Sequence, residues 1–153
     1  MSDTMARAEN GTLAPEEGEV LDVFGARLVV KAYPATAGFL LAEHVVPPGF
    51  LVPPHVHQGE DEVFFMLEGE LTLLDGGGAR RIGPGCTAQL PAGLLHGFRN
   101  DTGAPVRFLV ALRPGLQGIE MFRHFDRAGR AAPRGLTSPE IVAICAQYGV
   151  TTG

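Results

Sequence analysis

The stretch from Gly49 to Gly69, GFLVPPHVHQGEDEVFFMLEG, constrains this chain more than any other segment. Side chains two positions apart in a β-strand point to the same face, so His55 and His57 are predicted to project together. Glu62 begins another β-rich run directly after the turn-prone QGED. Its carboxylate is therefore placed to close a cluster of three metal-binding side chains.

A fourth candidate ligand, His96, lies in a second segment rich in glycine and proline, GCTAQLPAGLLHGFRN. An isolated His-x-His pair in a strand is more often a surface feature, but Glu62 and His96 together favour metal binding. Imidazole and carboxylate ligands suit divalent first-row metals, and the sequence does not distinguish iron, manganese, nickel, cobalt, copper and zinc. Three or four protein ligands leave positions open on an octahedral ion, which is typical of catalytic rather than structural metals.

These two segments match two sequence motifs at every defined position. The first motif, G-x5-H-x-H-x4-E-x6-G, is matched by Gly49, His55, His57, Glu62 and Gly69. The second, G-x5-P-x-G-x2-H-x3-N, is matched by Gly85, Pro91, Gly93, His96 and Asn100. Residues 20–115 therefore resemble a small cupin. The resemblance implies a β-barrel with a metal in its mouth, bound by three histidines and one glutamate. Because cupins include oxygenases, isomerases, epimerases, lyases, storage proteins and ligand sensors, it defines the fold and the metal better than the reaction.

Composition is that of one soluble domain, and it disfavours several classes of partner. The 153 residues are enough for a substantial core, and 12 basic against 17 acidic residues give a net charge of -5. Because no basic stripe is present, nucleic acid is not an expected partner. No apolar run approaches the roughly 20 residues needed to cross a bilayer. Residues 1–11 lack the apolar region of a secretory signal, and Cys86 and Cys145 are too few for a disulfide framework, so we expect a cytoplasmic protein.

The chain is expected to have three parts and an all-β fold. Its 21 glycines and 12 prolines favour short strands and tight turns. Residues 1–18 are predicted to be a flexible N-terminal arm, residues 19–115 a cupin double-stranded β-helix (a jelly-roll barrel), and residues 116–153 an extension of short helices. In the last helix, Ser138 suits the N-cap and Pro139 the first helical position. These helices either roof the cavity or build a dimer contact, and the arm and the sheet edges favour a homodimer.

Apolar side chains are predicted to surround the metal site. Four apolar side chains lie near the candidate ligands in the sequence: Phe50, Phe64, Met66 and Phe98. Two-residue alternation places most of them on the same strand face as a ligand. They would line a pocket for an aromatic, apolar or polyketide-like small molecule. No Lys or Arg is obviously aimed inward, which argues against sugar phosphates. His44, on an earlier strand, is interpreted as a satisfied or exposed histidine, with a role beside the metal ligands as the alternative.

Our leading hypothesis is a metal-dependent dioxygenase that acts on a flavonol-like or other enolic aromatic molecule. Glu62 would be the catalytic residue, because a partly detached ligand carboxylate can accept a substrate proton. The C-terminal segment resembles the tail of quercetinase-like single-barrel cupins, which ends in a Tyr-Gly pair, here Tyr148 and Gly149. A second hypothesis is non-redox cyclisation, isomerisation or lyase chemistry on a polyketide-like intermediate. A third is a binding module without catalysis, although such a module has no need of four ligands.

Overall fold

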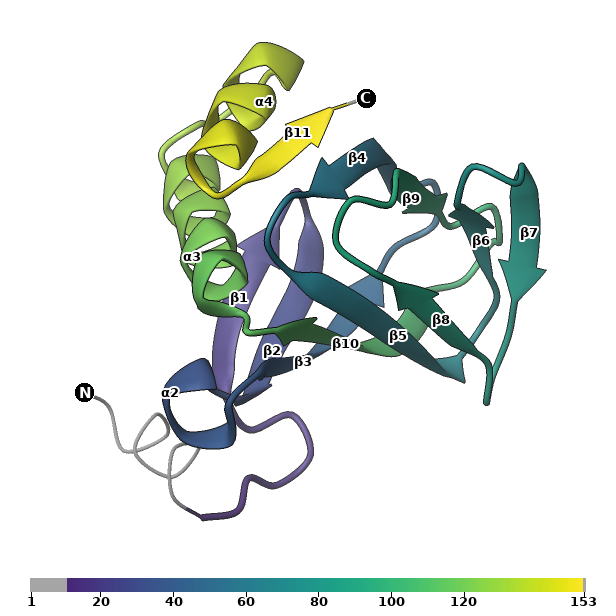
Figure 1. Ribbon diagram of the computed structural model, residues 1–153, viewed down its shortest axis with the longest axis horizontal. Helices are drawn as coiled ribbons and strands as arrows, with labels where there is room; N and C mark the ends of the chain where they lie inside the picture. Colours follow the sequence, from purple (N-terminus) through teal and green to yellow (C-terminus); the bar gives the residue numbers. More distant parts are fainter. Residues whose placement is uncertain (1–10, 153) are drawn as a thin grey trace.

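Two antiparallel β-sheets enclose the core of the protein in the computed structural model, which describes residues 11–152 (Figure 1). The larger sheet contains, in spatial order, β1 (Glu19–Val23), β2 (Ala26–Ala32), β3 (Leu40–Val46), β10 (Val106–Arg113), β5 (Asp61–Glu68) and β8 (Thr87–Leu90). The smaller sheet contains β11 (Val150–Thr152), β4 (Leu51–His57), β9 (His96–Arg99), β6 (Leu71–Leu74) and β7 (Ala79–Ile82). The all-β jelly-roll fold predicted from the sequence is confirmed.

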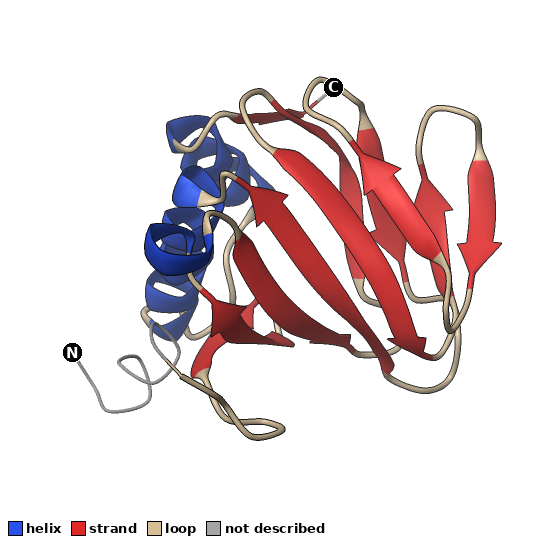
Figure 2. Cartoon of the chain, turned by 60° about the horizontal axis from the view of Figure 1, so that its bottom comes forward, coloured by secondary structure: helices blue, strands red, loops and turns tan. Residues whose placement is uncertain are grey.

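Three helices among the described residues gather at one side of the sheets, as Figure 2 shows in blue. They are α2 (Pro34–Ala37), α3 (Leu116–Arg130) and α4 (Ser138–Gln147). Ile119, Phe122 and Phe125 form the buried stripe of α3, at the spacing that an amphipathic helix requires. None of the helices in this part of the chain is long and apolar enough to span a membrane.

The start of α4 differs by one residue from the sequence prediction. Thr137, not Ser138, is the N-cap residue, and its side chain accepts a hydrogen bond from the Glu140 backbone N–H. The Glu140 side chain in turn accepts from the Thr137 N–H, which completes a capping box. Because this reciprocal pair needs a three-residue spacing, Glu140 selects Thr137 over Ser138.

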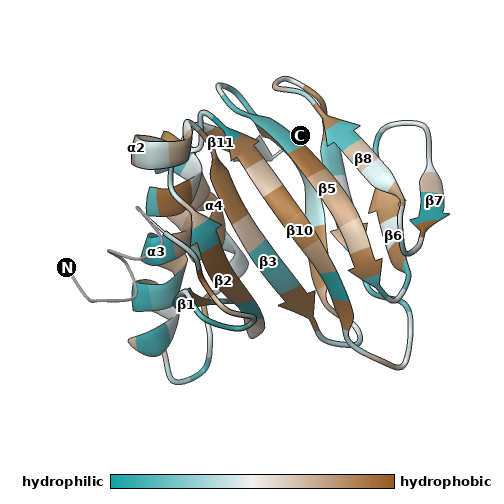
Figure 3. Ribbon diagram, turned by 90° about the horizontal axis from the view of Figure 1, so that it is seen from below, coloured by the Kyte–Doolittle hydropathy of each residue, from teal (hydrophilic) through white to brown (hydrophobic). Residues whose placement is uncertain are grey.

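The core lies between the two sheets, and the central strands of the larger sheet alternate between buried and more exposed side chains. In β5, Glu62, Phe64 and Met66 are buried whereas Val63 and Phe65 are exposed, so the face predicted for the ligand strand is the inward face. In β3 every second side chain is likewise buried. Figure 3 shows the resulting hydrophobic residues, in brown, along β3, β10 and β5. These strands form the centre of the larger sheet, so the core is continuous behind the ligand face.

Residues 11–18 lie against the larger sheet where the structure describes them. The Lys31 ammonium group on β2 donates to the Ala14 and Glu17 carbonyl oxygens, at 2.8 Å each. A Cβ atom added to Gly18, whose φ is +150°, would lie 2.4 Å from the Val30 carbonyl oxygen, so the backbones of the two segments touch. The remaining residues of the predicted flexible arm, 1–10, lie outside the described part of the chain.

The chain after α4 forms a strand that the sequence did not reveal. In β11, Val150, Thr151 and Thr152 pair antiparallel with residues 55–57 of β4, which is the strand that carries two of the candidate ligands. The Gln58 backbone N–H extends this pairing by donating to the Gly149 carbonyl oxygen at 2.8 Å. The C-terminal segment is therefore hydrogen-bonded directly to the ligand strand.

Candidate metal centre

Strands β4 and β9 place three of the four candidate ligands. Along β4, the two-residue alternation brings His55 and His57 to the same side, and their Nε2 atoms lie 3.2 Å apart. The register of β4 and β9 shifts between Val52 and His55, and His55 then lies opposite His96. The two strands approach closely there because the residue after His96 is a glycine. A Cβ on Gly97 would lie 2.5 Å from the Val52 carbonyl oxygen.

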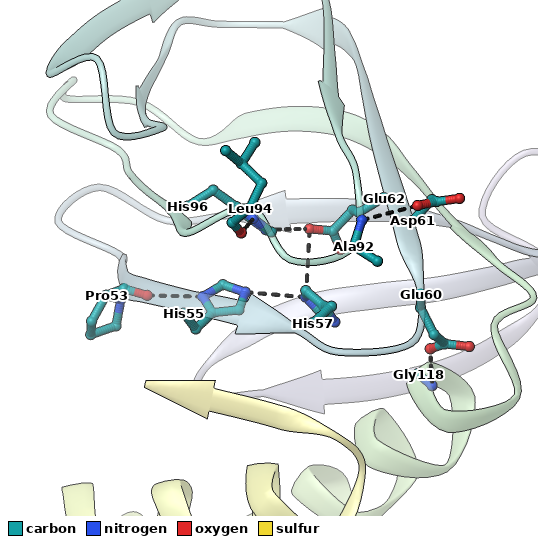
Figure 4. A network of polar contacts seen from close by, with 10 residues as sticks. All are labelled: Pro53, His55, His57, Glu60, Asp61, Glu62, Ala92, Leu94, His96 and Gly118. Carbon is teal, nitrogen blue, oxygen red and sulfur yellow. Dashed lines mark hydrogen bonds and ion pairs between the residues drawn. The ribbon is translucent and has the colours of Figure 1, made fainter. Parts of the chain in front are cut away.

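Glu62 reaches the same point from β5, in the other sheet (Figure 4). Its Oε1 atom lies 2.9 Å from His96 Nε2 and 3.8 Å from His57 Nε2. The cluster therefore connects the two sheets across the barrel. His96 and Glu62 are almost fully buried, with 1% and 6% of their surface exposed. Desolvation at this depth strengthens each polar contact within the cluster.

Backbone carbonyl groups determine the tautomers of two histidines. The Nδ1 atoms of His55 and His96 lie 2.9 Å and 3.1 Å from the carbonyl oxygens of Pro53 and Leu94 (Figure 4). A carbonyl oxygen can only accept, so each Nδ1 carries the hydrogen and donates it. In the neutral ring, Nε2 then presents its lone pair to the cluster, which is the arrangement of a metal-binding histidine.

Burial and Glu62 together set the protonation states of the cluster. Burial lowers the pKa of His55 to about 4, and it also lowers the pKa of His57. Burial acts in the same direction on His96, but the hydrogen bond and the negative charge of Glu62 outweigh it and raise the pKa of that histidine. Burial alone would raise the pKa of Glu62, but the hydrogen bond from His96 and the nearby histidine charges lower it. Near neutral pH the carboxylate is therefore ionised and His55 and His57 are neutral, as metal ligands must be.

The spacing of the donor atoms fits a divalent transition metal. Ligand atoms that lie about 2.1 Å from an ion and at right angles to each other are about 3.0 Å apart. The donor pairs given above span 2.9–3.8 Å, and all four donor atoms lie within 4.8 Å of one another. A set of three imidazoles and one carboxylate suits first-row metals and does not select one of them.

A cavity of about 270 Å³ opens beside the cluster. Three ligands line it, and so do Phe64 and Phe98; the other two predicted pocket residues, Phe50 and Met66, are buried but are not among its lining residues. A further part of the wall comes from α3, α4 and β11, which we call the cover; its lining residues are Met121, Phe122, Phe125, Ser138, Ile141, Val142, Cys145, Val150 and Thr152. The helices therefore line the cavity, which was one of the two roles left open by the sequence.

His44 also lines this cavity, which the sequence analysis did not favour. Its side chain is buried, with 6% of its surface exposed, and its Nε2 atom has no hydrogen-bond partner among the described residues. Burial lowers the pKa of His44 to about 4, so its ring is neutral near pH 7. A buried polar group without a partner costs about 1–3 kcal/mol. The alternation in β3 contained the signal, but both faces of that strand are rich in apolar residues.

Glu60 is a second polar residue that the sequence analysis missed. It is buried in the loop between β4 and β5. Its carboxylate accepts a hydrogen bond of 2.8 Å from the Gly118 backbone N–H, in the first turn of α3 (Figure 4). The N-cap residue of that helix, Gly115, has no side chain to satisfy these donors. Glu60 supplies the missing acceptor and a negative charge at the positive end of the helix. It thereby joins the ligand loop to the cover.

Comparison with known families agrees with this geometry. Residues 42–112 match the Cupin domain family, and this range includes all four candidate ligands. The chain is a small cupin. Its matched region covers the strands that carry the ligands, and the cover follows that region in the sequence. Membership of the family agrees with a metal site in the barrel, without defining the ion.

Individual relatives of this cupin differ in their named activities. Quercetin 2,3-dioxygenase of Bacillus subtilis (strain 168) is 30% identical over 89 residues, which are 58% of this chain and 26% of the relative. Germin-like protein subfamily 2 member 4 of Arabidopsis thaliana is 35% identical over 104 residues, which are 64% of this chain and 47% of the relative. The match thus spans about a quarter of the Bacillus subtilis protein and about half of the Arabidopsis thaliana protein. A cupin-superfamily sugar phosphate isomerase from Silicibacter pomeroyi superposes with a TM-score of 0.58 and 27% identity, over 67% of this chain and 74% of that one.

Proposed function

We propose that this cupin is a metal-dependent dioxygenase that acts on a compact, flavonol-like or other enolic aromatic molecule. The observation that carries the proposal is the position of the four-residue cluster at the wall of an apolar cavity. The named activity of the Bacillus subtilis relative supports it over the matched region. A cavity of about 270 Å³ is close to the lower end of the range for ligand pockets, about 300–1,000 Å³, which favours a small ring system.

In this proposal His55, His57, Glu62 and His96 hold the metal. A redox-active ion in this site would supply the one-electron chemistry that a reaction with dioxygen requires. Glu62 accepts the proton of the enolic hydroxyl group as the substrate binds. Its Oε1 atom is the one that faces the Nε2 atoms of His96 and His57, so the proton is accepted at Oε2. The lowered pKa of Glu62 keeps this acceptor ionised near neutral pH.

The apolar walls orient the substrate and exclude water. Phe64 and Phe98 meet edge to face, with ring centroids 5.5 Å apart, and both line the cavity. They offer aromatic surface beside the cluster, while the cover lines a further part of the cavity. Removing water from this space strengthens the interaction between Glu62 and the enolic proton, because fewer dipoles screen it.

The experiment is a measurement of metal content and oxygen uptake on one sample. Protein purified without added metal is analysed for bound metals and assayed on flavonol and catechol panels. Redox-active metal with oxygen uptake that Glu62→Ala abolishes and His124→Ala preserves supports the dioxygenase. Stoichiometric zinc and no uptake after loading with iron, manganese, cobalt, nickel or copper would exclude it.

The second candidate is a non-redox reaction on the same metal, namely cyclisation, isomerisation or lyase chemistry on a polyketide-like molecule. The named activity of the Silicibacter pomeroyi structure favours non-redox chemistry of this kind. A sugar phosphate is a poor match for this cavity, because none of its lining residues among those described is Lys or Arg. This candidate predicts full turnover with redox-inert zinc. A barrel that only binds a ligand would retain that binding in His57→Ala.

The proposal includes a cytoplasmic homodimer with a small-molecule substrate. Two apolar side chains on the outer face of β5, Val63 and Phe65, are exposed to 38% and 41% and offer a surface for a second copy. Light scattering coupled to gel filtration measures the mass. A dimer that Phe65→Glu dissociates supports this part of the proposal, and a wild-type monomer contradicts it.

A further inference from the structure

His44 is an unexpected residue at its position in the fold. It lies on the inward face of β3, where the neighbouring inward side chains, Ala42 and Val46, are buried and apolar. In the pairing register it lies opposite Leu28 on β2 and Phe108 on β10. Three phenylalanine rings surround it, with centroids at 6.0 Å for Phe50, 6.3 Å for Phe98 and 5.3 Å for Phe108. Packing alone would be satisfied by an apolar residue.

The described protein offers no hydrogen bond to His44 Nε2, and the ring lines the cavity that contains the metal cluster. Because no partner fixes this nitrogen, a rotation about the Cβ–Cγ bond can exchange ring nitrogens and carbons without breaking a hydrogen bond at Nε2. A ligand in the cavity is the group that can satisfy the ring. His44 therefore gives an otherwise apolar region of the cavity wall one polar contact.

We infer that His44 is a substrate-binding residue that determines specificity by hydrogen-bonding a hydroxyl or carbonyl group of the bound molecule. This inference rests on the proposed function only for the class of ligand, an oxygenated aromatic molecule. A neutral imidazole has one donor and one acceptor, and a hydroxyl group can match either. The low pKa of His44 agrees with a neutral partner rather than a carboxylate. The metal cluster and His44 would thus hold two different oxygens of one ligand and fix its orientation.

The test measures binding without turnover. Zinc-loaded full-length protein is titrated with 3-hydroxyflavone and with a series of derivatives that each carry one additional hydroxyl group at a different ring position. Wild type should bind at least one derivative about tenfold more tightly than the parent compound, as one added buried hydrogen bond gives. In His44→Leu this ratio should fall to about one, while zinc content and affinity for the parent compound stay within about twofold.

Two further variants separate hydrogen bonding from packing. His44→Gln keeps a side-chain donor and acceptor and should retain part of the preference for the hydroxylated probe. His124→Leu is the matched control, because His124 lies on α3, contacts Tyr148 and is not a lining residue of the cavity. It should retain the full preference. Equal preference in wild type and His44→Leu, or no preference at any ring position in wild type, would overturn the inference.

A measurement on the wild-type protein makes the test independent of the folding of the variants. The chain has five histidines, so their ring nitrogens are resolvable by ¹⁵N NMR. Binding of the preferred probe should change the ¹⁵N chemical shift of a ring nitrogen of His44, and binding of the parent compound should change it less. Equal responses would contradict the inference. Oxygen uptake plays no part in these titrations, so failure of the dioxygenase proposal cannot imitate failure of the proposal for His44.

Discussion

The two walls of the cavity are built in different ways. The ligand wall comes from β4, β5 and β9, and it is polar at its centre, with three imidazoles and one carboxylate within 4.8 Å. The cover, α3, α4 and β11, contributes mainly apolar side chains to the same cavity and adjoins the ligand wall where β11 pairs with β4. The ligand wall thus contains the groups that can bind a metal, whereas the cover limits the size and shape of the molecule beside it.

This difference means that metal binding and substrate selection are separable. The four ligands lie within residues 55–96, inside the region that matches the cupin family, and the cover lies after it. Substitutions in the ligand wall should therefore change metal affinity and leave the cover folded. Substitutions at the contacts between the two should change stability and have smaller effects on the metal. The following predictions test this separation, beginning with the largest expected effect.

Removing one ligand should have the largest effect. His96→Ala deletes the histidine whose Nε2 atom lies 2.9 Å from Glu62 Oε1, so the metal loses one of its four ligands. We expect metal affinity to fall by more than about a hundredfold, since even partners outside the ligand set contribute about 10–100-fold. Competition with a fluorescent chelator measures the affinity, and circular dichroism verifies the helices of the cover. Unchanged affinity in His96→Ala would remove this residue from the site, and His124→Ala is the control.

Gly97→Ala should disturb the ligand wall by steric conflict. The new Cβ would lie 2.5 Å from the Val52 carbonyl oxygen and 2.8 Å from Pro54 N, so β4 must move away from β9. We expect a loss of about 1–3 kcal/mol in the free energy of unfolding of the metal-free protein. Metal affinity should fall about tenfold, because His55 moves with β4.

The matched control for this substitution is Gly103→Ala, because a Cβ there meets nothing within 4 Å. Chemical unfolding and chelator competition on the two variants give both quantities. Equal losses in the two variants would show that the close approach of β4 and β9 is not what Gly97 provides.

Glu60→Gln should weaken the junction between the two walls. The substitution keeps an oxygen that can accept from the Gly118 N–H but removes the negative charge at the N-terminus of α3. We expect a loss of about 1 kcal/mol in the free energy of unfolding and metal affinity within about twofold of wild type. Glu70→Gln removes an exposed carboxylate that lies 3.7 Å from Arg81, and it should lower the free energy of unfolding by less. A large loss of metal affinity in Glu60→Gln would contradict the separation of the two walls.

The ligand wall could be predicted from the sequence because its determinants are local. His55 and His57 are two residues apart, and alternation in one strand fixes their relative direction. The same rule, applied to Glu62, placed Phe64 and Met66 on the inward face. Only the lining of the cavity differed: Met66 is fully buried but is not among the lining residues.

The other features depend on contacts that no local pattern contains. Glu60 and Gly118 are 58 positions apart, so the acceptor for α3 is invisible in the sequence of the helix. In β3 both faces are rich in apolar residues, so alternation could not show that His44 points inward. β11 has three residues, and it is a strand because it pairs with β4. Such features arise from tertiary packing, which overrides weak local preferences.

The smallest expected effect concerns a second contact between the cover and the larger sheet, the ion pair of Glu19 on β1 with Arg123 on α3. The Arg123 guanidinium group donates to both carboxylate oxygens at 2.9 Å, and the Tyr33 hydroxyl group donates to one of them. Burial alone would raise the pKa of Glu19, but these hydrogen bonds and the positive charge outweigh it and lower the pKa. The folded protein therefore binds the proton less tightly than the unfolded chain, whose value is near 4.5. The resulting stabilisation is complete above that pH and is lost as the pH falls through the lower folded value.

Glu19→Gln should therefore be less stable than wild type at pH 7, by less than about 1 kcal/mol because the pair is partly exposed to solvent. The difference should shrink as the pH falls below the unfolded value near 4.5 and through the lower folded value, where the wild-type carboxylate becomes protonated and loses its charge as well. Urea unfolding at pH 7, 5, 4 and 3 measures it. Glu120→Gln removes a more exposed contact of the same guanidinium group, 3.0 Å away, and should alter the pH dependence less. If the difference in the free energy of unfolding between wild type and Glu19→Gln stays constant from pH 7 to pH 3, packing rather than charge holds α3 against β1. In that case, the cover would be attached to the barrel mainly through its apolar stripe.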